Sequence, residues 1–327
     1  MKKVLITAAV AALILVLVPV AVCGAPKKNG GPSQESESTQ QNAAQDSRTN
    51  DEEESIAVFL PDAGQTSVLT MEDYVIGAVA AEMPAAYEEE ALKAQAAACV
   101  TLARYMQRSN RDKKDLNGAV IAADAKKYQG YMTVEEMRSR WGDDFDACYR
   151  KIKSAVEAVL PYTVCYDGEP ILAAFHAVSS GLTEDAETLW GKKVAYLVNT
   201  ESEGDRLCPG YASSLTVSPE EFREKIGFQT EEADPAKWIG EGEYSKAGTL
   251  LKLQTGDKTV SGETLRDLFG LRSNAVKVRF DGGDFVLDVT GYGHGVGMSQ
   301  YGADYYARQG LTWREILAHY YPGTEIS

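Results

Sequence analysis

The chain has 327 residues, 44% of them hydrophobic, which is enough apolar material for one large domain or two small ones. Its 48 acidic residues against 33 basic ones give a net charge of −15, which argues against a nucleic-acid partner, because such a partner requires a basic face. The five cysteines are widely spaced and include no C-x-x-C pair, so they indicate neither a disulfide framework nor a zinc knuckle.

The N-terminus predicts a membrane anchor over residues 1–23. Lys2 and Lys3 precede an apolar run from 4 to 22, close to the ~20 residues that span a bilayer. The two lysines favour a cytoplasmic N-terminus, with the remainder of the chain outside. Lipid attachment at Cys23 and cleavage just after it are alternatives that the sequence leaves open.

Residues 24–55 are rich in Ser, Gln, Asn, Gly and Glu and contain almost no large apolar side chains. Such a segment cannot bury enough surface to fold, so we expect a disordered acidic linker. The folded domain is then expected over 56–327, with a possible subdomain at 210–290.

Helical and strand patterns alternate along the folded part and predict an α+β fold, in which helices and antiparallel hairpins form a curved domain. The first elements are a strand at 56–60, a helix that Thr70 caps and Pro84 ends, and a long helix from Glu88 to Gln107. The later expected elements are a helix at 152–160, a hairpin of strands 162–166 and 171–175, a helix from Ser218 to Gly227, a strand at 249–255, a helix at 263–269, a hairpin of strands 275–280 and 285–289, and a closing helix pair through 311–321.

Glu82 is a lone acid between an apolar helix and a helix breaker, Pro84. Apolar surroundings and the negative end of the preceding helix both raise a carboxyl pKa, which suits a general acid near neutral pH. A solvated residue at a helix end is the competing interpretation. A hydrolytic glycosidase normally uses two carboxylates. A single acid suits a reaction in which the substrate supplies its own nucleophile.

Glycines alternate with other residues from Gly291 to Gly297. The spacing fits neither a phosphate loop nor a dinucleotide fingerprint. Alternate glycines instead let the backbone approach another segment or a ligand closely. His294, at the centre, is either a satisfied structural residue or a ligand contact.

His176, Ser179, Ser180 and Glu184 have the residue types of a Ser-His-acid triad, but no G-x-S-x-G elbow accompanies them. His176, Glu184 and Cys208 form the one plausible zinc set, and their spacing is poor. We therefore predict no metal and no cofactor. Cys99, among alanines, is expected to pack as a small hydrophobic residue.

Four motifs resemble those of the stage II sporulation protein D family, in the family's order and spacing from about Ser67 to the C-terminus. They are Ala81-Glu82-Met83-Pro84 followed by Glu90 to Ala96, Ser179-x-Gly181-x-Thr183-Glu184, Val260-Ser261-Gly262 with Leu265-Arg266 and Leu271-Arg272-Ser273, and Gly293 to Ala303. The chain departs from the family pattern at Val100, where arginine is expected, and Arg104 lies one turn further on.

The resemblance implies a peptidoglycan lytic transglycosylase with Glu82 as the acid and then the base. The glutamate protonates the oxygen between MurNAc and GlcNAc, and the C6 hydroxyl of the same MurNAc attacks to give a 1,6-anhydro end. The residues implied to line or support the groove are Gln95, His176, Ser179, Thr183, Glu184, His294, Gln300 and Tyr301, with Glu184 as a candidate to stabilise the oxocarbenium-like transition state.

The resemblance also implies a setting. The protein would act on glycan strands during engulfment in sporulation, with sporulation proteins P and M of the engulfment complex as partners. A single N-terminal helix would hold it in the mother-cell membrane, with the catalytic domain outside the cytoplasm and facing the forespore. A non-catalytic cell-wall-binding module or amidase enhancer is the alternative that the same resemblance allows.

Overall fold

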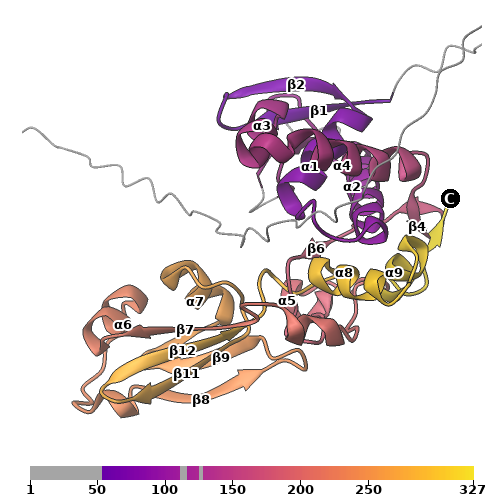
Figure 1. Cartoon of the computed structure of the whole chain (residues 1–327). Coiled ribbons are helices and arrows are strands. Elements are labelled where there is room, and N and C mark those ends of the chain that lie inside the picture. Colours follow the sequence, from indigo (N-terminus) through magenta and orange to yellow (C-terminus); the bar gives the residue numbers. More distant parts are fainter. Residues whose placement is uncertain (1–53, 111–115, 125–127) are drawn as a thin grey trace, which may run out of the picture. The chain divides into compact units, whose positions relative to one another are not determined.

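The computed structural model describes residues 54–110, 116–124 and 128–327, which form a mixture of helices and small sheets (Figure 1). The α+β class predicted from the sequence is confirmed. The predicted anchor at 1–23 and nearly all of the predicted linker at 24–55 lie outside the described residues. Within the described ranges, no helix has the length and apolar character needed to cross a membrane.

The first half of the domain is mainly helical. Its elements are β1 (Ser55–Leu60), β2 (Gln65–Thr70), α1 (Met71–Glu82), α2 (Glu89–Ser109), β3 (Ile121–Ala122), α3 (Val134–Trp141), α4 (Phe145–Val159), β4 (Val164–Tyr166), β5 (Glu169–Pro170) and β6 (Phe175–His176). Strand β1 pairs antiparallel with β2 and parallel with β3. Thr70 caps α1, because its hydroxyl accepts a hydrogen bond from Asp73 N–H at 3.0 Å.

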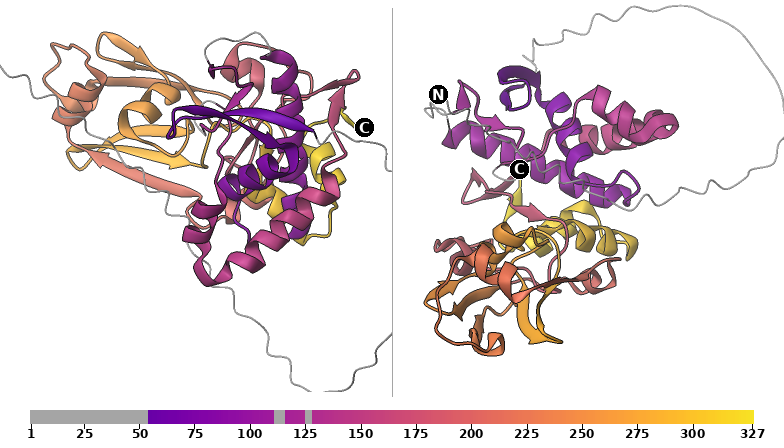
Figure 2. Two further views of the ribbon diagram at one scale, coloured as in Figure 1. Left: turned by 90° about the horizontal axis from the view of Figure 1, so that it is seen from above. Right: turned by 90° about the vertical axis from the view of Figure 1, so that its left-hand side faces the viewer.

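Helix α2 is the centre of the first hydrophobic core. Half of its buried residues, between Ala91 and Ala103, are alanine, so neighbouring helices approach it closely. Helices α1 and α4 pack against it, and so do α8 (Gln300–Arg308) and α9 (Trp313–Tyr320) from the other end of the sequence. Figure 2 shows the yellow C-terminal helices beside the indigo ones. The two ends of the folded chain therefore share one core.

The second half holds a separate hydrophobic cluster that extends from Val217 to Val289. The elements of this second half are α5 (Ala186–Trp190), β7 (Ala212–Val217), α6 (Pro219–Ile226), β8 (Ile239–Tyr244), β9 (Leu250–Thr255), β10 (Lys258–Val260), α7 (Gly262–Phe269), β11 (Val276–Asp281) and β12 (Asp284–Thr290). Two further short strands, β13 (Met298–Ser299) and β14 (Glu325–Ile326), lie near the C-terminus. The sheets are ordered β11-β12-β7 and β10-β9-β8. Whether 210–290 behaves as a subdomain stays a prediction.

The main differences between the predicted elements and the structure are three. The helix expected at 152–160 begins earlier, at Phe145, and α3 precedes it. The expected strand at 171–175 does not form as one strand, and only Phe175 of it lies in a strand, β6. The hairpin partner of β4 is instead β5, which falls in the expected turn, because the turn at Asp167-Gly168 is tight, with both residues at positive φ. Strand β2 was not predicted, because its alternation of small polar residues carries little apolar signal.

Phe222 on α6 is the centre of the second core. It is fully buried, and its ring stacks on Phe285 with 4.0 Å between ring centroids. Phe222→Ala should lower the free energy of unfolding by about 3–5 kcal/mol, because it removes buried surface and leaves a cavity. Urea unfolding measures this loss. Leu268→Ala, at a residue 38% exposed, should cost less than about 1 kcal/mol. Equal costs for the two variants would contradict the assignment of the core.

Candidate functional site

Glu82 is the last residue of α1, and the chain leaves the helix immediately after it. Met83 has extended backbone angles, and its N–H donates to the carbonyl of Val79 at 2.9 Å. Pro84 cannot continue the helix. The side chain of Glu82 is partly buried and so remains open to solvent on one side, as a residue that contacts a substrate must be.

The segment 128–132 runs along α1 and contributes the hydrogen bond to Glu82. Gly130 N–H donates to Oε1 of Glu82 at 2.5 Å. A Cβ at Gly130 would lie 2.8 Å from that oxygen and 3.1 Å from the Cβ of Ala81, so the close approach requires glycine. Gly77 of α1 has the same function one turn earlier, since a Cβ there would clash with the ring of Tyr131 at 2.3 Å.

Burial raises the pKa of Glu82 above its ordinary value, and the hydrogen bond from Gly130 partly offsets this rise. No cation forms an ion pair with Glu82 among the described residues. The predicted general acid is therefore in the electrostatic environment that the sequence indicated: an uncompensated carboxyl whose protonated form is favoured.

The loop after Glu82 is fastened to two other parts of the domain. Lys151 of α4 donates to the carbonyl oxygens of Ala85 at 3.0 Å and Tyr87 at 2.5 Å. The carboxylate of Asp304, on α8, accepts from Glu88 N–H at 2.7 Å. These bonds hold the C-terminal end of α1 and the start of α2 in fixed positions, which limits the movement of Glu82.

Gln95 and Gln300 lie together in the interior. Gln300 Nε2 donates to Oε1 of Gln95 at 3.4 Å, and Gln95 Nε2 donates to the sulfur of Cys99 at 3.4 Å. Their exposed fractions are 0% for Gln95 and 5% for Gln300, so both support the site from within. Cys99 is buried as predicted, but it accepts hydrogen bonds, so it is more than a small hydrophobic residue.

The glycine-rich segment lies directly against the strand that carries His176. Strand β13 pairs parallel with β6, with Ser299 opposite His176. A Cβ at Gly297 would lie 2.0 Å from the carbonyl oxygen of Ala174, and Gly297 has φ +75°. The predicted close backbone approach is confirmed, and the partner is the chain itself.

His176 and His294 are neighbours, with ring centroids 5.8 Å apart. Burial lowers the pKa of His176 to about 3 and that of His294 to about 4, so both rings are neutral at pH 7. Nδ1 of His176 lies 3.1 Å from the carbonyl of Val296 and so carries its proton, while Nδ1 of His294 accepts from Val296 N–H. Nε2 of His176 is buried without a hydrogen-bond partner.

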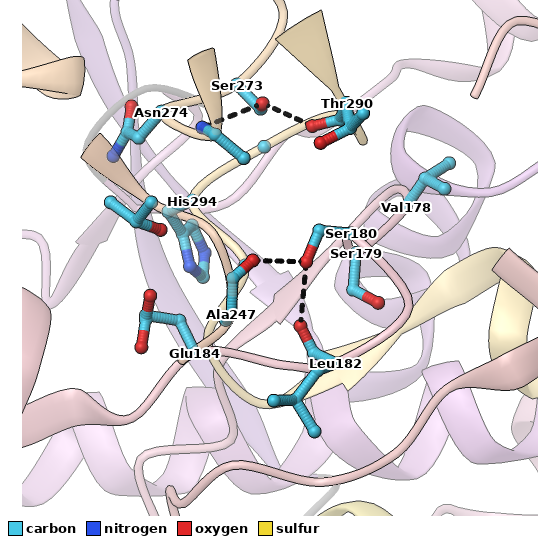
Figure 3. Close-up of a pocket in the computed structure, with 14 residues that line it drawn as sticks. Val178, Ser179, Ser180, Leu182, Glu184, Ala247, Ser273, Asn274, Thr290 and His294 are labelled. Carbon is cyan, nitrogen blue, oxygen red and sulfur yellow. Dashed lines mark hydrogen bonds between the residues drawn. The ribbon is translucent and has the colours of Figure 1, made fainter. Parts of the chain in front are cut away.

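Glu184 lies beside His294 at a small cavity of about 20 Å³ with a mixed polar and apolar lining, room for about one water molecule (Figure 3). Its carboxylate is 1% exposed and accepts from Ser245 Oγ at 2.6 Å and Asp185 N–H at 2.9 Å. The hydroxyl of Ser180 donates to the carbonyl of Ala247 across the same cavity. Glu184 thus joins the loop after His176 to the β8–β9 connection.

Two other predicted residues are buried and bonded to the protein. Ser179 N–H donates to the buried carboxylate of Asp205 at 2.7 Å, and the hydroxyl of Thr183 accepts from Thr200 N–H at 2.9 Å. Tyr301, by contrast, is partly exposed, and its ring meets that of Tyr87 edge-on with centroids 6.3 Å apart. Tyr87 lies on the loop that follows Glu82, so this contact joins the C-terminal motif to the acid's loop.

Val100, where the resemblance leads us to expect arginine, and Arg104, one turn further on, both have structural roles. Val100 is fully buried in the first core. The guanidinium of Arg104 donates to the carbonyls of Leu160 and Tyr162 and pairs with Glu54. None of these contacts involves Glu82, so Arg104 does not replace the expected arginine there.

Sequence reasoning missed Gly130, Gln129 and Tyr74. The Tyr74 hydroxyl donates to Oε1 of Gln129 at 2.7 Å, and both side chains are buried. The sequence offers only the dipeptide Gln129-Gly130 as a local signal. Gly130 lies 48 residues from Glu82 in the sequence, so nothing local connects the two. In the described part of the chain, no group of three or more His, Cys, Asp or Glu residues is placed to hold a metal ion.

Comparison with known proteins defines the class. The family model described as Stage II sporulation protein matches residues 62–166, which include Glu82 and Gly130. The chain is 33% identical to stage II sporulation protein D of Bacillus subtilis (strain 168), over 100% of this chain and 96% of that protein. It is 34% identical to the protein of the same name from Bacillus amyloliquefaciens, over 84% of this chain and 78% of that protein.

A more distant relative is the amidase enhancer of Bacillus subtilis (strain 168), 26% identical over 77% of this chain and 40% of that protein. The chain therefore belongs to the stage II sporulation protein D family, as its motifs predicted, and is a sporulation protein of that family.

The raised pKa of Glu82 predicts a pH-dependent cost in stability. A carboxyl whose pKa is higher in the folded state stabilises the fold below its unfolded-state pKa of about 4.3, and this contribution is lost as the pH rises through the folded-state value. Glu82→Gln should therefore match the wild type near pH 4 and be more stable at pH 7, by about 1.4 kcal/mol for each unit of pKa elevation. Urea unfolding at several pH values measures the difference.

Glu135→Gln, at an exposed position on α3, is the control and should show no such trend. A Glu82→Gln variant that does not gain stability relative to the wild type between pH 4 and pH 7 would contradict the raised pKa.

Proposed function

We propose that this protein is a peptidoglycan lytic transglycosylase and that Glu82 is its catalytic residue. The observation that supports this most is the environment of Glu82: burial and one backbone hydrogen bond set its pKa, with no contribution from a second carboxylate among the described residues. Glycoside hydrolysis normally uses a pair of carboxylates. One protonated acid is sufficient where the substrate itself supplies the nucleophile.

In the proposed reaction Glu82 donates its proton to the oxygen between MurNAc and GlcNAc as the bond from that oxygen to the MurNAc anomeric carbon breaks. The C6 hydroxyl oxygen of the same MurNAc bonds to that carbon. The Glu82 carboxylate, now ionised, takes the proton of this hydroxyl and returns to its starting state. The products are a 1,6-anhydro-MurNAc end and a free GlcNAc end, and no water is consumed.

The other residues predicted to line or support the groove fall into two groups, partly exposed and buried. His294 and Tyr301 keep exposed surface and are the ones we propose to touch the glycan. Gln95, His176, Ser179, Thr183 and Glu184 are buried and act as supports. Gln300 is nearly buried and belongs with the supports. The Nδ1 of neutral His294 is occupied by Val296 N–H, and a backbone hydrogen bond to Phe175 engages the ring as well, so His294 has mainly its ring face to offer a ligand.

The cellular setting is part of the proposal. The protein would act on glycan strands during engulfment, in a complex with sporulation proteins P and M. It would be held by one helix in the mother-cell membrane with its catalytic domain outside the cytoplasm. The family supports a role in sporulation, and the partners and location are inferred from the resemblance.

A second candidate is a non-catalytic wall-binding module that stimulates an amidase. The similarity to a protein named amidase enhancer and the valine at position 100 favour it. The two candidates differ in one respect: an enhancer needs no ionisable group at Glu82, whereas a transglycosylase does.

Digestion of purified peptidoglycan, intact and stripped of stem peptides, tests the proposal. The wild type should release anhydro-MurNAc ends, detected by mass spectrometry, and Glu82→Gln should lower their yield by at least about 10²-fold, because general acid catalysis contributes about 10²–10⁴-fold. The kcat/KM of the wild type should fall as pH rises through the pKa of Glu82, because the acid must begin protonated.

Glu135→Gln should digest as fast as the wild type. Stimulation of a wall amidase by both the wild type and Glu82→Gln, without anhydro ends on either glycan, would establish the enhancer instead.

A further inference from the structure

A chain of buried polar side chains connects the hydrogen-bond donor of Glu82 to the C-terminal motif. The Tyr74 hydroxyl donates to Oε1 of Gln129 at 2.7 Å, and Nε2 of Gln129 donates to the sulfur of Cys99 at 2.6 Å. The same sulfur accepts from Gln95 at 3.4 Å, and Gln95 accepts from Gln300, also at 3.4 Å. All five side chains are 5% exposed or less.

Gln129 is held at both ends of its amide. Its oxygen is occupied by Tyr74 of α1 and its nitrogen by Cys99 of α2, so its side chain has one orientation between the two helices. The peptide bond from Gln129 to Gly130 carries the N–H that binds Glu82. A fixed Gln129 side chain restricts the backbone of Gln129, and with it the range of directions open to that N–H.

Apolar residues would fill this space at lower energetic cost. The buried face of α2 is otherwise alanine, leucine, valine and threonine, and an unpaired amide there is costly. A buried polar chain in which each member satisfies the next instead specifies one arrangement, and the loss of one member weakens its neighbours. The arrangement that this chain specifies is the position of Gly130 relative to Glu82.

We propose that Gln129 is a positioning residue for the acid: Tyr74 and Cys99 hold its amide so that Gly130 N–H points at Glu82, and Gln95 and Gln300 link this arrangement to the glycine-rich motif. The proposal rests on the proposed function of Glu82 as a general acid. It assigns Gln95 and Gln300 to the support of the acid, not to the glycan.

Burial raises the pKa of Glu82, and among the groups that face it the hydrogen bond from Gly130 is what stabilises the ionised form. Tyr74 on α1 and Cys99 on α2 sense the charge of Glu82, and burial raises the pKa of both, so they stay neutral. The nearby cations bind backbone carbonyls: Arg140 of α3 binds that of Ala80, and Lys151 of α4 binds those of Ala85 and Tyr87.

Tyr74→Phe tests the proposal, because it removes one hydroxyl and keeps the ring that stacks on Tyr131. The pKa of Glu82 should rise in this variant, since the ionised form loses its hydrogen bond from Gly130. Carboxyl-carbon NMR titration of the ¹³C-glutamate-labelled full-length protein measures it without substrate, with Glu82 assigned from the resonance missing in Glu82→Gln. Gly130→Ala should raise the pKa too, because its Cβ displaces the carboxylate.

Gln95→Met, farther along the polar chain, should produce a smaller rise. On glycan, Tyr74→Phe should lower kcat/KM by about 10- to 100-fold, the effect expected of a misplaced catalytic group, and should shift the alkaline fall in activity to higher pH. Tyr320→Phe is the matched control. It also loses a buried hydroxyl, which is 2.7 Å from Ser202 Oγ, and should shift neither the pKa nor the pH profile.

The outcomes separate the two proposals. An unchanged Glu82 pKa in Tyr74→Phe and Gly130→Ala, in a wild type that produces anhydro ends, would overturn the positioning role and leave the proposed function intact. A raised pKa in a protein that releases no anhydro ends would support the polar chain and count against the transglycosylase. If Tyr320→Phe shifts the Glu82 pKa as much as Tyr74→Phe does, the shift reflects a general loss of packing in the core, and this result would also overturn the proposal.

Discussion

The hydrogen bond from Gly130 N–H to Glu82 is the interaction on which the site depends. Burial favours the protonated carboxyl and the N–H favours the ionised one, so the two effects oppose each other. A residue that must give up a proton and take it back needs both. Much of the nearby structure serves this one contact: Gly77 makes room for Tyr131, Tyr131 stacks on Tyr74, and segment 128–132 thereby lies along α1.

The C-terminal motif, residues 293–303, positions the backbone around the site as well as supplying side chains to it. Its glycines let the backbone run against the strand that carries His176, where a Cβ at Gly297 would meet the carbonyl oxygen of Ala174 and one at Gly293 would meet the Cβ of His176. This pairing delivers Gln300 to the interior beside Gln95 and leaves Tyr301 at the surface beside Tyr87. One short segment thus reaches the acid by two routes, through the buried amides and through the loop that follows Glu82. The glycines in this segment are therefore explained by the close approach of its backbone to the neighbouring strand.

Local signals in the sequence were sufficient for the acid and its helix. Thr70 and Pro84 marked the ends of α1, and the isolation of Glu82 among apolar residues indicated its raised pKa. Long-range contacts could not be predicted in this way. Gly130 lies in a segment of mixed composition, and nothing local shows that its N–H meets Glu82. Glu184 has the residue type of a catalytic partner, yet three-dimensional packing gives its oxygens to Ser245 and Asp185.

The valine at position 100 has a consequence for the same balance. It follows Cys99, whose thiol senses the charge of Glu82, and it is fully buried. A guanidinium introduced there would be a buried cation on the helix that carries Cys99, and a cation lowers the pKa of a carboxyl that it approaches. With valine, the backbone N–H of Gly130 remains as the stabiliser of the ionised acid. The ionised acid therefore depends on the placement of this one peptide group.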